Sequence, residues 1–209
     1  LALRYAIHEG SAWVNYVRSH DDIGWTFSDD DARELGIDPF GHRMFLNHFY
    51  GLKFEGSFAK GLPFQYNPET RDLRVCGTTA SLAGLELAYE KRDEGYREDA
   101  IKRILLIYSV VISLGGIPLI YLGDEIGTMN DYSFTDDPEK KEDSRWVHRV
   151  AMDWDKATSG ESQSVAERLK NALTHRIRLR KEIPAFGNGD IQVIETTNEH
   201  VLGYLKNDD

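Results

Sequence analysis

The chain has 209 residues, 41% of them hydrophobic and 29% charged, so it can bury a sizeable core and need not be disordered. Its formal net charge of -10, from 25 Lys and Arg against 35 Asp and Glu, repels nucleic acid and anionic lipid. The composition therefore favours a globular protein with a neutral, polar partner, and it argues against a nucleic-acid or membrane partner.

The single cysteine, Cys76, cannot form an internal disulfide, and no second Cys or Cys/His cluster indicates a structural zinc site. We expect it to be a small, half-buried side chain that simply packs. The first residues, 1–5, show neither a Met start nor a basic region leading into an apolar run, unlike a signal peptide. The longest apolar stretch, 104–114, is too short to span a bilayer. We expect a piece of a longer, cytoplasmic protein, with secretion left open if a signal lies upstream.

The N-terminal part of the sequence predicts a helix and then a strand. Residues 1–8 have a helical pattern, whereas residues 12–18 alternate and carry β-branched and aromatic side chains. The strand ends at Ser19-His20-Asp21-Asp22.

From this point to about residue 99 the sequence is irregular and rich in Gly, Asp and aromatic residues, with helices expected near 41–53 and 79–92. Because connecting loops usually run about 2–6 residues, a segment of this length indicates an inserted subdomain. Such insertions tend to carry function.

The next part of the chain predicts a helix followed by a buried parallel strand. Residues 99–114 form the apolar helix, and Gly115-Gly116 ends it. Residues 117–122 are short, apolar on both faces and bounded by Gly, which is typical of a buried parallel strand. Together they make one unit of a βα repeat.

The C-terminal part begins with a polar loop, 130–160, and continues with an amphipathic helix over 163–182 that Pro184 ends. Its apolar stripe consists of Val165, Leu169, Leu173 and Ile177. Residues 191–194 and 201–205 then predict a hairpin that opens a new β element.

Three clusters could carry chemistry. The first is His20-Asp21-Asp22, because catalytic groups of a parallel α/β barrel stand at the C-terminal ends of its strands. A His beside two carboxylates could bind sugar hydroxyls and favour a positive, oxocarbenium-like centre. The alternative is that Asp21 or Asp22 caps a following helix.

The second cluster is Gly123-Asp124-Glu125, whose carboxylates emerge beside His20 if both strands belong to one barrel; we expect them to support the site rather than to react. The third is the loop 142–149, in which the guanidinium of Arg145 and the indole of Trp146 could hold hydroxyls and stack on a sugar face. A charged, exposed loop explains the same residues.

The predicted insertion adds side chains that suit a hydroxyl-rich ligand, although its aromatic residues could equally form its core. These side chains are Arg43, Gln65, Tyr66, Asn67 and Arg74.

Residues 16–25 and 117–125 resemble two signatures of the α-amylase superfamily, glycoside hydrolase family 13, in the order of the seventh and eighth strands of its (β/α)8 barrel. The similarity extends from about Trp13 to Arg149 and is closer to the amylosucrases and related sucrose hydrolases. The segments that carry this closer similarity are 56–61, 63–68, 74–78 and 143–146.

The resemblance implies roles for individual residues. Asp21 matches the transition-state stabiliser at the glucosyl subsite, His20 matches a sugar-hydroxyl ligand beside it, and Arg145 matches an Arg that closes the glucosyl pocket. Positions that contact the fructosyl unit or an acceptor glucan in amylosucrases match Asp22, Arg43, Gln65 and Arg74.

The family also needs a nucleophilic Asp, in a Gly-Phe-Arg-x-Asp-Ala pattern, and an acid/base Glu, and the sequence contains neither segment. We therefore expect the isolated chain to be inactive and Arg145 to be unpaired, because its usual Asp partner lies far upstream.

The sequence thus predicts an α/β fold: the C-terminal part of a (β/α)8 TIM barrel, about strands 7 and 8, with an inserted, mostly helical subdomain and the start of a C-terminal β-domain. The expected parts are a barrel segment (1–26), the insertion (27–98), barrel helix 7, strand 8, loop and helix 8 (99–185), and the start of the β-domain (186–209).

The expected function is that of part of a retaining α-glucosyl enzyme that acts on sucrose, by transfer to an α-glucan or by hydrolysis. Sucrose and α-glucan are the expected partners, with no metal or organic cofactor. Uncovered barrel edges suggest self-association. The alternatives are a non-catalytic carbohydrate-binding or assembly module, and another superfamily activity such as that of an α-glucosidase or trehalose synthase.

Overall fold

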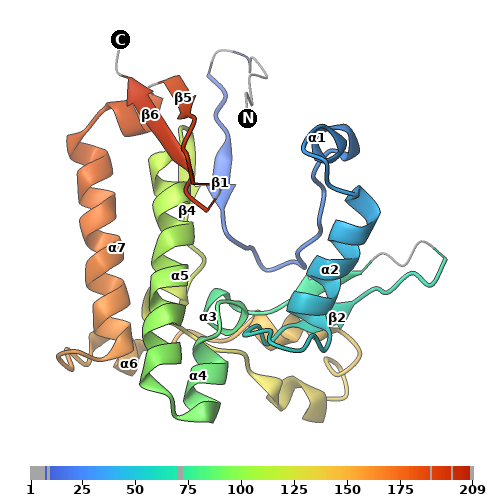
Figure 1. Ribbon diagram of the computed structural model, residues 1–209. Coiled ribbons are helices and arrows are strands. Elements are labelled where there is room, and N and C mark those ends of the chain that lie inside the picture. The colour runs from blue at the N-terminus through green and yellow to red at the C-terminus, as the bar shows by residue number, and fades with distance from the viewer. Residues whose placement is uncertain (1–7, 9, 70–72, 189, 199, 208–209) are drawn as a thin grey trace.

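The computed structural model describes residues 8, 10–69, 73–188, 190–198 and 200–207. The helix expected over 1–8 lies outside this part of the chain, apart from His8. The described residues form an α/β structure of helices and three two-stranded sheets. Helices α1 and α2 lie on one side of strand β1, and the pair α5–α7 lies on the other (Figure 1).

The two strands expected to be parallel are parallel neighbours. Strand β1 (Val14–Tyr16) pairs with β4 (Ile117–Leu119), with Val14 opposite Ile117 and Tyr16 opposite Leu119. Both strands are shorter than predicted. Because their C-terminal ends lie at the same edge, the segments that follow Tyr16 and Leu119 are brought close together.

One face of this parallel pair is open to solvent. Val14, Tyr16, Ile117 and Leu119 are 47%, 52%, 55% and 41% exposed. Parallel sheets are normally covered on both faces, so this face is unusual. Two parallel strands alone do not define a barrel.

Helices α5 (Glu94–Ser113) and α7 (Val165–Glu182) form the main core and lie side by side (Figure 1). Asp93 caps α5 and Ser164 caps α7, each accepting a hydrogen bond from a backbone N–H of the first turn. The predicted stripe on α7 is confirmed, since all four of its residues pack into the cluster that contains Ile104, Tyr108 and Ile112.

The described residues between β1 and α5 form four helices and a hairpin. The helices expected near 41–53 and 79–92 are observed, but the second is interrupted at Gly84, whose φ of 95° begins a new helix. The hairpin was not predicted. In chain order the elements are α1 (Asp29–Glu34), α2 (Pro39–Gly51), β2 (Leu62–Phe64), β3 (Arg74–Cys76), α3 (Thr79–Leu82) and α4 (Leu85–Lys91).

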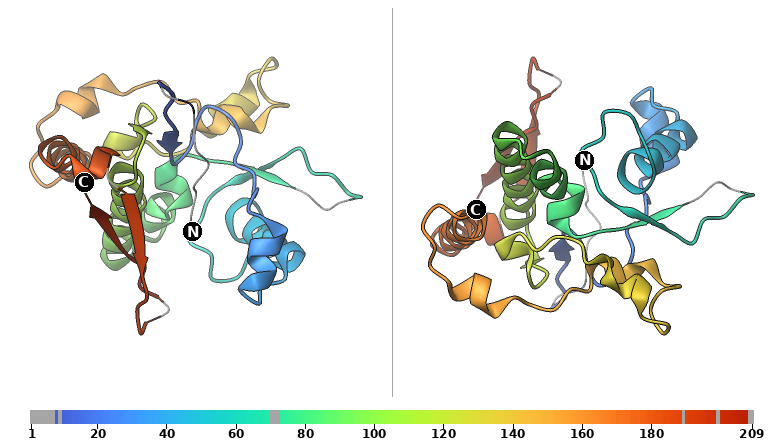
Figure 2. Two further views of the ribbon diagram at one scale, coloured as in Figure 1. Left: turned by 90° about the horizontal axis from the view of Figure 1, so that it is seen from above. Right: turned by 90° about the horizontal axis from the view of Figure 1, so that it is seen from below.

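After β4 the chain forms short helical turns before α7. The predicted C-terminal hairpin is confirmed as an antiparallel pair, and it stands out from the helices (Figure 2). No helix in the described part of the chain is long and apolar enough to cross a membrane. The remaining elements are η1 (Asp124–Ile126), η2 (Tyr132–Asp136), η3 (Ser144–His148), α6 (Trp154–Thr158), α8 (Ala185–Asn188), β5 (Asp190–Ile194) and β6 (Gly203–Asn207).

Candidate functional site

Asp21 lies just beyond the end of β1, with its carboxylate about half exposed and close to two guanidinium groups and an imidazole. Arg145 Nη1 and Arg149 Nη2 lie 3.4 and 3.6 Å from Asp21 Oδ1, and His20 Nε2 lies 3.6 Å from Oδ2. The structure thus brings together Asp21, His20 and Arg145, which the sequence singled out in two segments more than 120 residues apart.

Arg145 belongs to η3, and its guanidinium is held on two sides. Its Nε and Nη2 atoms each donate to a different oxygen of Asp143 at 2.9 Å, and its Cζ lies 4.7 Å above the ring of Phe64. The hydrogen bond from Arg145 is the main reason that the pKa of Asp143 is lowered. The expectation that Arg145 lacks a partner is therefore wrong, because the tight turn of η3 brings a carboxylate from two residues earlier to it.

Asp22 joins the strand end to the β2–β3 hairpin. Its carboxylate is nearly buried and lies 3.0 Å from Arg74 Nη1, while Ile23 and Val75 exchange backbone hydrogen bonds of 2.8 and 2.9 Å. The alternative that Asp21 or Asp22 caps the following helix is wrong, because Ser28 caps α1. Asp22 and Arg74 are thus a pair on the flank of Asp21.

Arg43 and Gln65 lie elsewhere on the insertion. Arg43 donates to the carbonyls of Trp25 and Phe27 and forms an ion pair with Asp29, so its hydrogen bonds hold the backbone that enters α1. Gln65 is exposed at the turn after β2, with a left-handed φ of 49°. Neither of these side chains has a hydrogen bond to Asp21 among the described residues.

A buried polar network lies behind the site. Arg18, two residues before His20, donates through Nε and Nη2 to Asp124 Oδ1 at 3.0 and 2.7 Å. Thr79 Oγ1 and the Tyr108 hydroxyl donate to Asp124 Oδ2 at 2.6 and 2.5 Å. Each of these four residues is at most 3% exposed. As expected, Asp124 supports the strand end from inside and does not face solvent.

His148 connects the segment between β1 and α5 to the backbone at His20 by hydrogen bonds. The Gly77 N–H donates to His148 Nδ1 at 3.0 Å, so the ring proton must lie on Nε2, which is 3.1 Å from the carbonyl of His20. Burial lowers the pKa of His148, which favours this neutral form. Arg149 Nε also donates to the His20 carbonyl, at 2.9 Å.

Sequence reasoning singled out the loop 142–149 but did not assign these roles to Asp143, His148 or Arg149. A local signal exists only for Asp143, whose position before Ser144 is typical of a capping residue. The inward orientation of His148 depends on contacts with residues 20 and 77, which no local pattern reveals.

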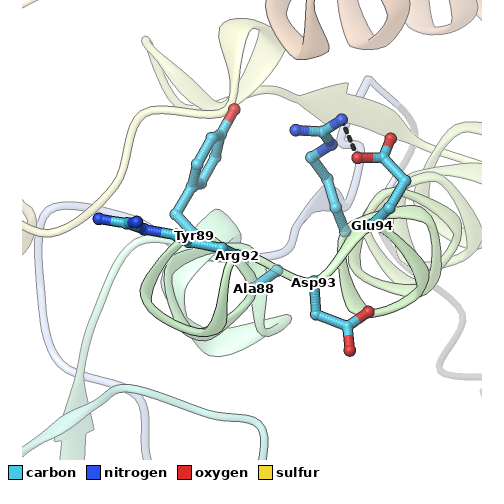
Figure 3. Close-up of a pocket in the computed structure, with 6 residues that line it drawn as sticks. Ala88, Tyr89, Arg92, Asp93 and Glu94 are labelled. Carbon is cyan, nitrogen blue, oxygen red and sulfur yellow. Dashed lines mark hydrogen bonds and ion pairs between the residues drawn. The ribbon is translucent and has the colours of Figure 1, made fainter.

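A separate surface hollow of about 200 Å³ lies where α4 meets α5, remote in sequence from Asp21 (Figure 3). Polar side chains that line this hollow are already engaged at the start of α5, since Asp93 caps this helix and Glu94 forms an ion pair with Arg97. The volume is below the roughly 300–1,000 Å³ typical of ligand sites. A larger hollow of about 480 Å³ lies between α5, α7 and residues of the C-terminal hairpin, but its lining is mostly apolar. The strand end, with its polar groups, is therefore the better candidate for a polar ligand.

The chemistry available at the strand end is that of polar recognition. A half-exposed carboxylate, two guanidinium groups and an imidazole can bind neighbouring hydroxyls, and the carboxylate can stabilise a nearby positive charge. Among the described residues, no group of three or more His, Cys, Asp and Glu is placed to hold a metal ion.

A comparison with protein families finds no family that matches the chain. Alpha-amylase 3 of Dictyoglomus thermophilum is 27% identical in an alignment of 122 residues that covers 50% of this chain and 23% of that protein. An α-amylase from H. orenii, known from a crystal structure, matches over 55% of this chain and 25% of its own, with 20% identity and a TM-score of 0.36. That TM-score does not establish a shared fold.

The matched part of the chain spans about a quarter of the length of each of these two proteins. The sequence similarity supports a weak homology to α-amylases at the level of their superfamily. Neither comparison singles out the amylosucrase type.

Proposed function

We propose that this chain forms part of a retaining α-glucosyl enzyme that acts on sucrose, and that Asp21 lies at its glucosyl subsite. The observation that carries the proposal is the convergence of Asp21, His20 and Arg145 at the end of β1. The distant similarity to α-amylases supports the class of substrate. The sucrose-type segments of the sequence support sucrose over other glucosides.

In this proposal each side chain has a defined task. Asp21 stabilises the positive charge that develops at the anomeric carbon, and His20 binds a hydroxyl of the same glucosyl unit. Arg145 closes the pocket and, together with Arg149, now occupies the space around the carboxylate. A bound sugar would replace these long ion pairs with hydrogen bonds to its hydroxyls.

The flank formed by Asp22 and Arg74 suits the fructosyl unit or an acceptor glucan. The two side chains are held at 3.0 Å, with Arg74 half exposed, so its guanidinium can reach a ligand while Asp22 keeps it in place. Transfer to an α-glucan and hydrolysis both fit this arrangement. Arg43 would act at this acceptor side indirectly, by fixing the segment that enters α1, and Gln65 would act from the exposed turn after β2.

Retaining chemistry needs a nucleophilic carboxylate and an acid/base carboxyl about 5–5.5 Å apart, and the sequence contains neither of the two family segments that supply them. We propose that another part of a longer protein provides both groups. The 209-residue chain by itself would then bind sugar without cleaving sucrose.

The exposed face of the β1–β4 pair supports the same view. A longer protein would cover Val14, Tyr16, Ile117 and Leu119 with further strands of a (β/α)8 barrel. In the isolated chain, the same face and the free strand edges would drive self-association. Light scattering should show a species larger than 23.8 kDa, and a monodisperse monomer would contradict this part of the proposal.

Fructose release from sucrose tests the function. The assay compares the 209-residue chain, the longest natural product of its gene, and that product with the substitution Asp21→Asn. The proposal predicts activity only in the longer protein and a loss of at least 100-fold in the variant, consistent with the loss of one electrostatic group. Cleavage by the short chain, or an unchanged rate in Asp21→Asn, would contradict it.

A second candidate is a non-catalytic carbohydrate-binding or assembly module, which the absence of the two family segments from the sequence favours. Under this alternative the longest natural product binds α-glucan or sucrose but releases no fructose.

A further inference from the structure

The backbone just before Asp21 is held by a side chain to which no function has been assigned. The His20 carbonyl accepts from His148 Nε2 at 3.1 Å and from Arg149 Nε at 2.9 Å. Both donors belong to the same short segment, whereas their acceptor lies about 128 residues earlier in the sequence. This carbonyl is one of the points at which the two segments of the site are joined, beside the ion pairs of Arg145 and Arg149 with Asp21.

His148 is itself fixed from the opposite side. Its Nδ1 accepts from the Gly77 N–H at 3.0 Å, and the residue is only 1% exposed. Because a backbone N–H can only donate, this bond selects the tautomer that leaves Nε2 protonated and directed at His20. A Cβ on Gly77 would lie 2.9 Å from Leu82 Cγ and Cδ2, so Leu82 packs closely against Gly77.

The backbone of the segment around His20 has few other hydrogen bonds among the described residues. Ile23 pairs with Val75, but between Arg18 and Ile23 the Asp21 N–H donates to the side chain of Ser19, at 3.1 Å. The remaining contacts are made by side chains, with Asp22 paired with Arg74 and Asp21 close to Arg145 and Arg149. The side chains of His20 and Asp21 are 67% and 52% exposed. The carbonyl clamp from His148 and Arg149 therefore restrains the exposed turn that carries both of these groups.

We propose that His148 is a positioning residue, which orients the His20–Asp21 turn for a glucosyl ligand through the hydrogen bond that its Nε2 tautomer directs at the His20 carbonyl. The inference rests on the proposed function, because it takes Asp21 and His20 to be the groups that face the sugar. Arg149 contributes the second bond to the same carbonyl and also lies 3.6 Å from Asp21 Oδ1.

Two substitutions separate positioning from packing. His148→Gln can place an amide N–H where Nε2 stands and keep the bond to His20, but it gives up the acceptor for Gly77. His148→Asn can place an acceptor where Nδ1 stands and keep the bond from Gly77, but it gives up the donor to His20. Both variants lose the imidazole, so each serves as the matched control for the other.

The experiment measures two quantities on the 209-residue chain: the NMR order parameters of the amides of residues 20–22, and the dissociation constant for sucrose. We expect His148→Gln to keep the order parameters and to bind sucrose within about 3-fold of the wild type. We expect His148→Asn to lower the order parameters and to weaken binding at least 10-fold. An equal response of the two variants in the order parameters would overturn the proposal.

The order parameters separate the positioning role of His148 from the proposed function. If residues 20–22 loosen only in His148→Asn while the wild type binds no sucrose, the positioning role stands and the proposed function fails. If a variant does not fold, the tautomer of His148 in the wild type is the test, because the ¹⁵N spectrum of its imidazole must show a protonated Nε2 and an unprotonated Nδ1. Protonation on Nδ1 would overturn the bridge.

Discussion

Asp124 is the acceptor of four hydrogen bonds in the buried network, and its replacement by Asn isolates the effect of its charge. Asn has nearly the same shape, so Asp124→Asn creates no cavity. The change leaves Arg18 with its charge buried at 3% exposure and without a carboxylate, and it turns an NH2 group toward donors on one side. The side chain can therefore no longer satisfy the guanidinium and the two hydroxyls together.

The expected loss in the free energy of unfolding follows from the burial of the Arg18–Asp124 ion pair. Removing one partner of a buried ion pair typically costs about 3–5 kcal/mol, which is a large share of the roughly 5–15 kcal/mol that stabilises a folded domain. With a urea m value of about 2 kcal/mol per molar, a loss of about 4 kcal/mol lowers the unfolding midpoint by about 2 M.

The assay is urea unfolding followed by tryptophan fluorescence, with Asp30→Asn as the control. Asp30 also pairs with an arginine, Arg33, at 2.9 Å, but its side chain is 89% exposed, so its loss should leave the midpoint nearly unchanged. If Asp124→Asn shifts the midpoint no more than Asp30→Asn does, the buried network does not stabilise the strand end in the way described.

Three further predictions concern packing, protonation and reactivity. Gly61→Ala should lower the free energy of unfolding by about 1–3 kcal/mol, because a Cβ there meets the Tyr50 carbonyl and lies 2.8 Å from Val75. Gly24→Ala, with open space around it, is the control in the same urea assay, and equal unfolding midpoints for the two variants would contradict the packing. The lowered pKa of His148 means that the unfolded chain binds a proton more readily than the folded chain does. The free energy of unfolding should therefore fall as the pH drops from about 6.5 toward the pKa of His148 in the folded chain. If the stability of the wild type and of His148→Gln depends on pH in the same way, this prediction is contradicted. The thiol of Cys76 is fully buried, and burial raises its pKa to about 12, so a thiol reagent at pH 8 should label it only after unfolding; rapid labelling of the native chain would contradict its burial.

The sequence predicted the helices of the core because their patterns are long. Helix α7 carries its apolar stripe over 18 residues, and the parallel strands are bounded by glycine and by charged residues. The β2–β3 hairpin was missed for the opposite reason. Each strand has three residues, and Pro63, which has no N–H to donate, stands in the middle of β2, so no alternation is visible.

The site was predictable only where its residues are neighbours in sequence. His20 and Asp21 follow a strand, and that context alone marks them. The partners of Asp21 come from η3, and the residue that orients His20 is also bonded to Gly77, so three distant segments must fold before the geometry exists. The prediction that Arg145 is unpaired was wrong because the family pattern indicates only the partner found in relatives, whereas in this structure Arg145 pairs with the nearby carboxylate of Asp143.

NMR can locate bound sucrose at the level of single residues. In a titration of the ¹⁵N-labelled chain, we expect amide shifts that are largest at residues 20–22 and 143–149 and that shrink strongly in Asp21→Asn. Shifts centred on the hollow at α4 and α5, an unchanged response in the variant, or no shifts at high sucrose concentration would contradict a glucosyl subsite at the end of β1.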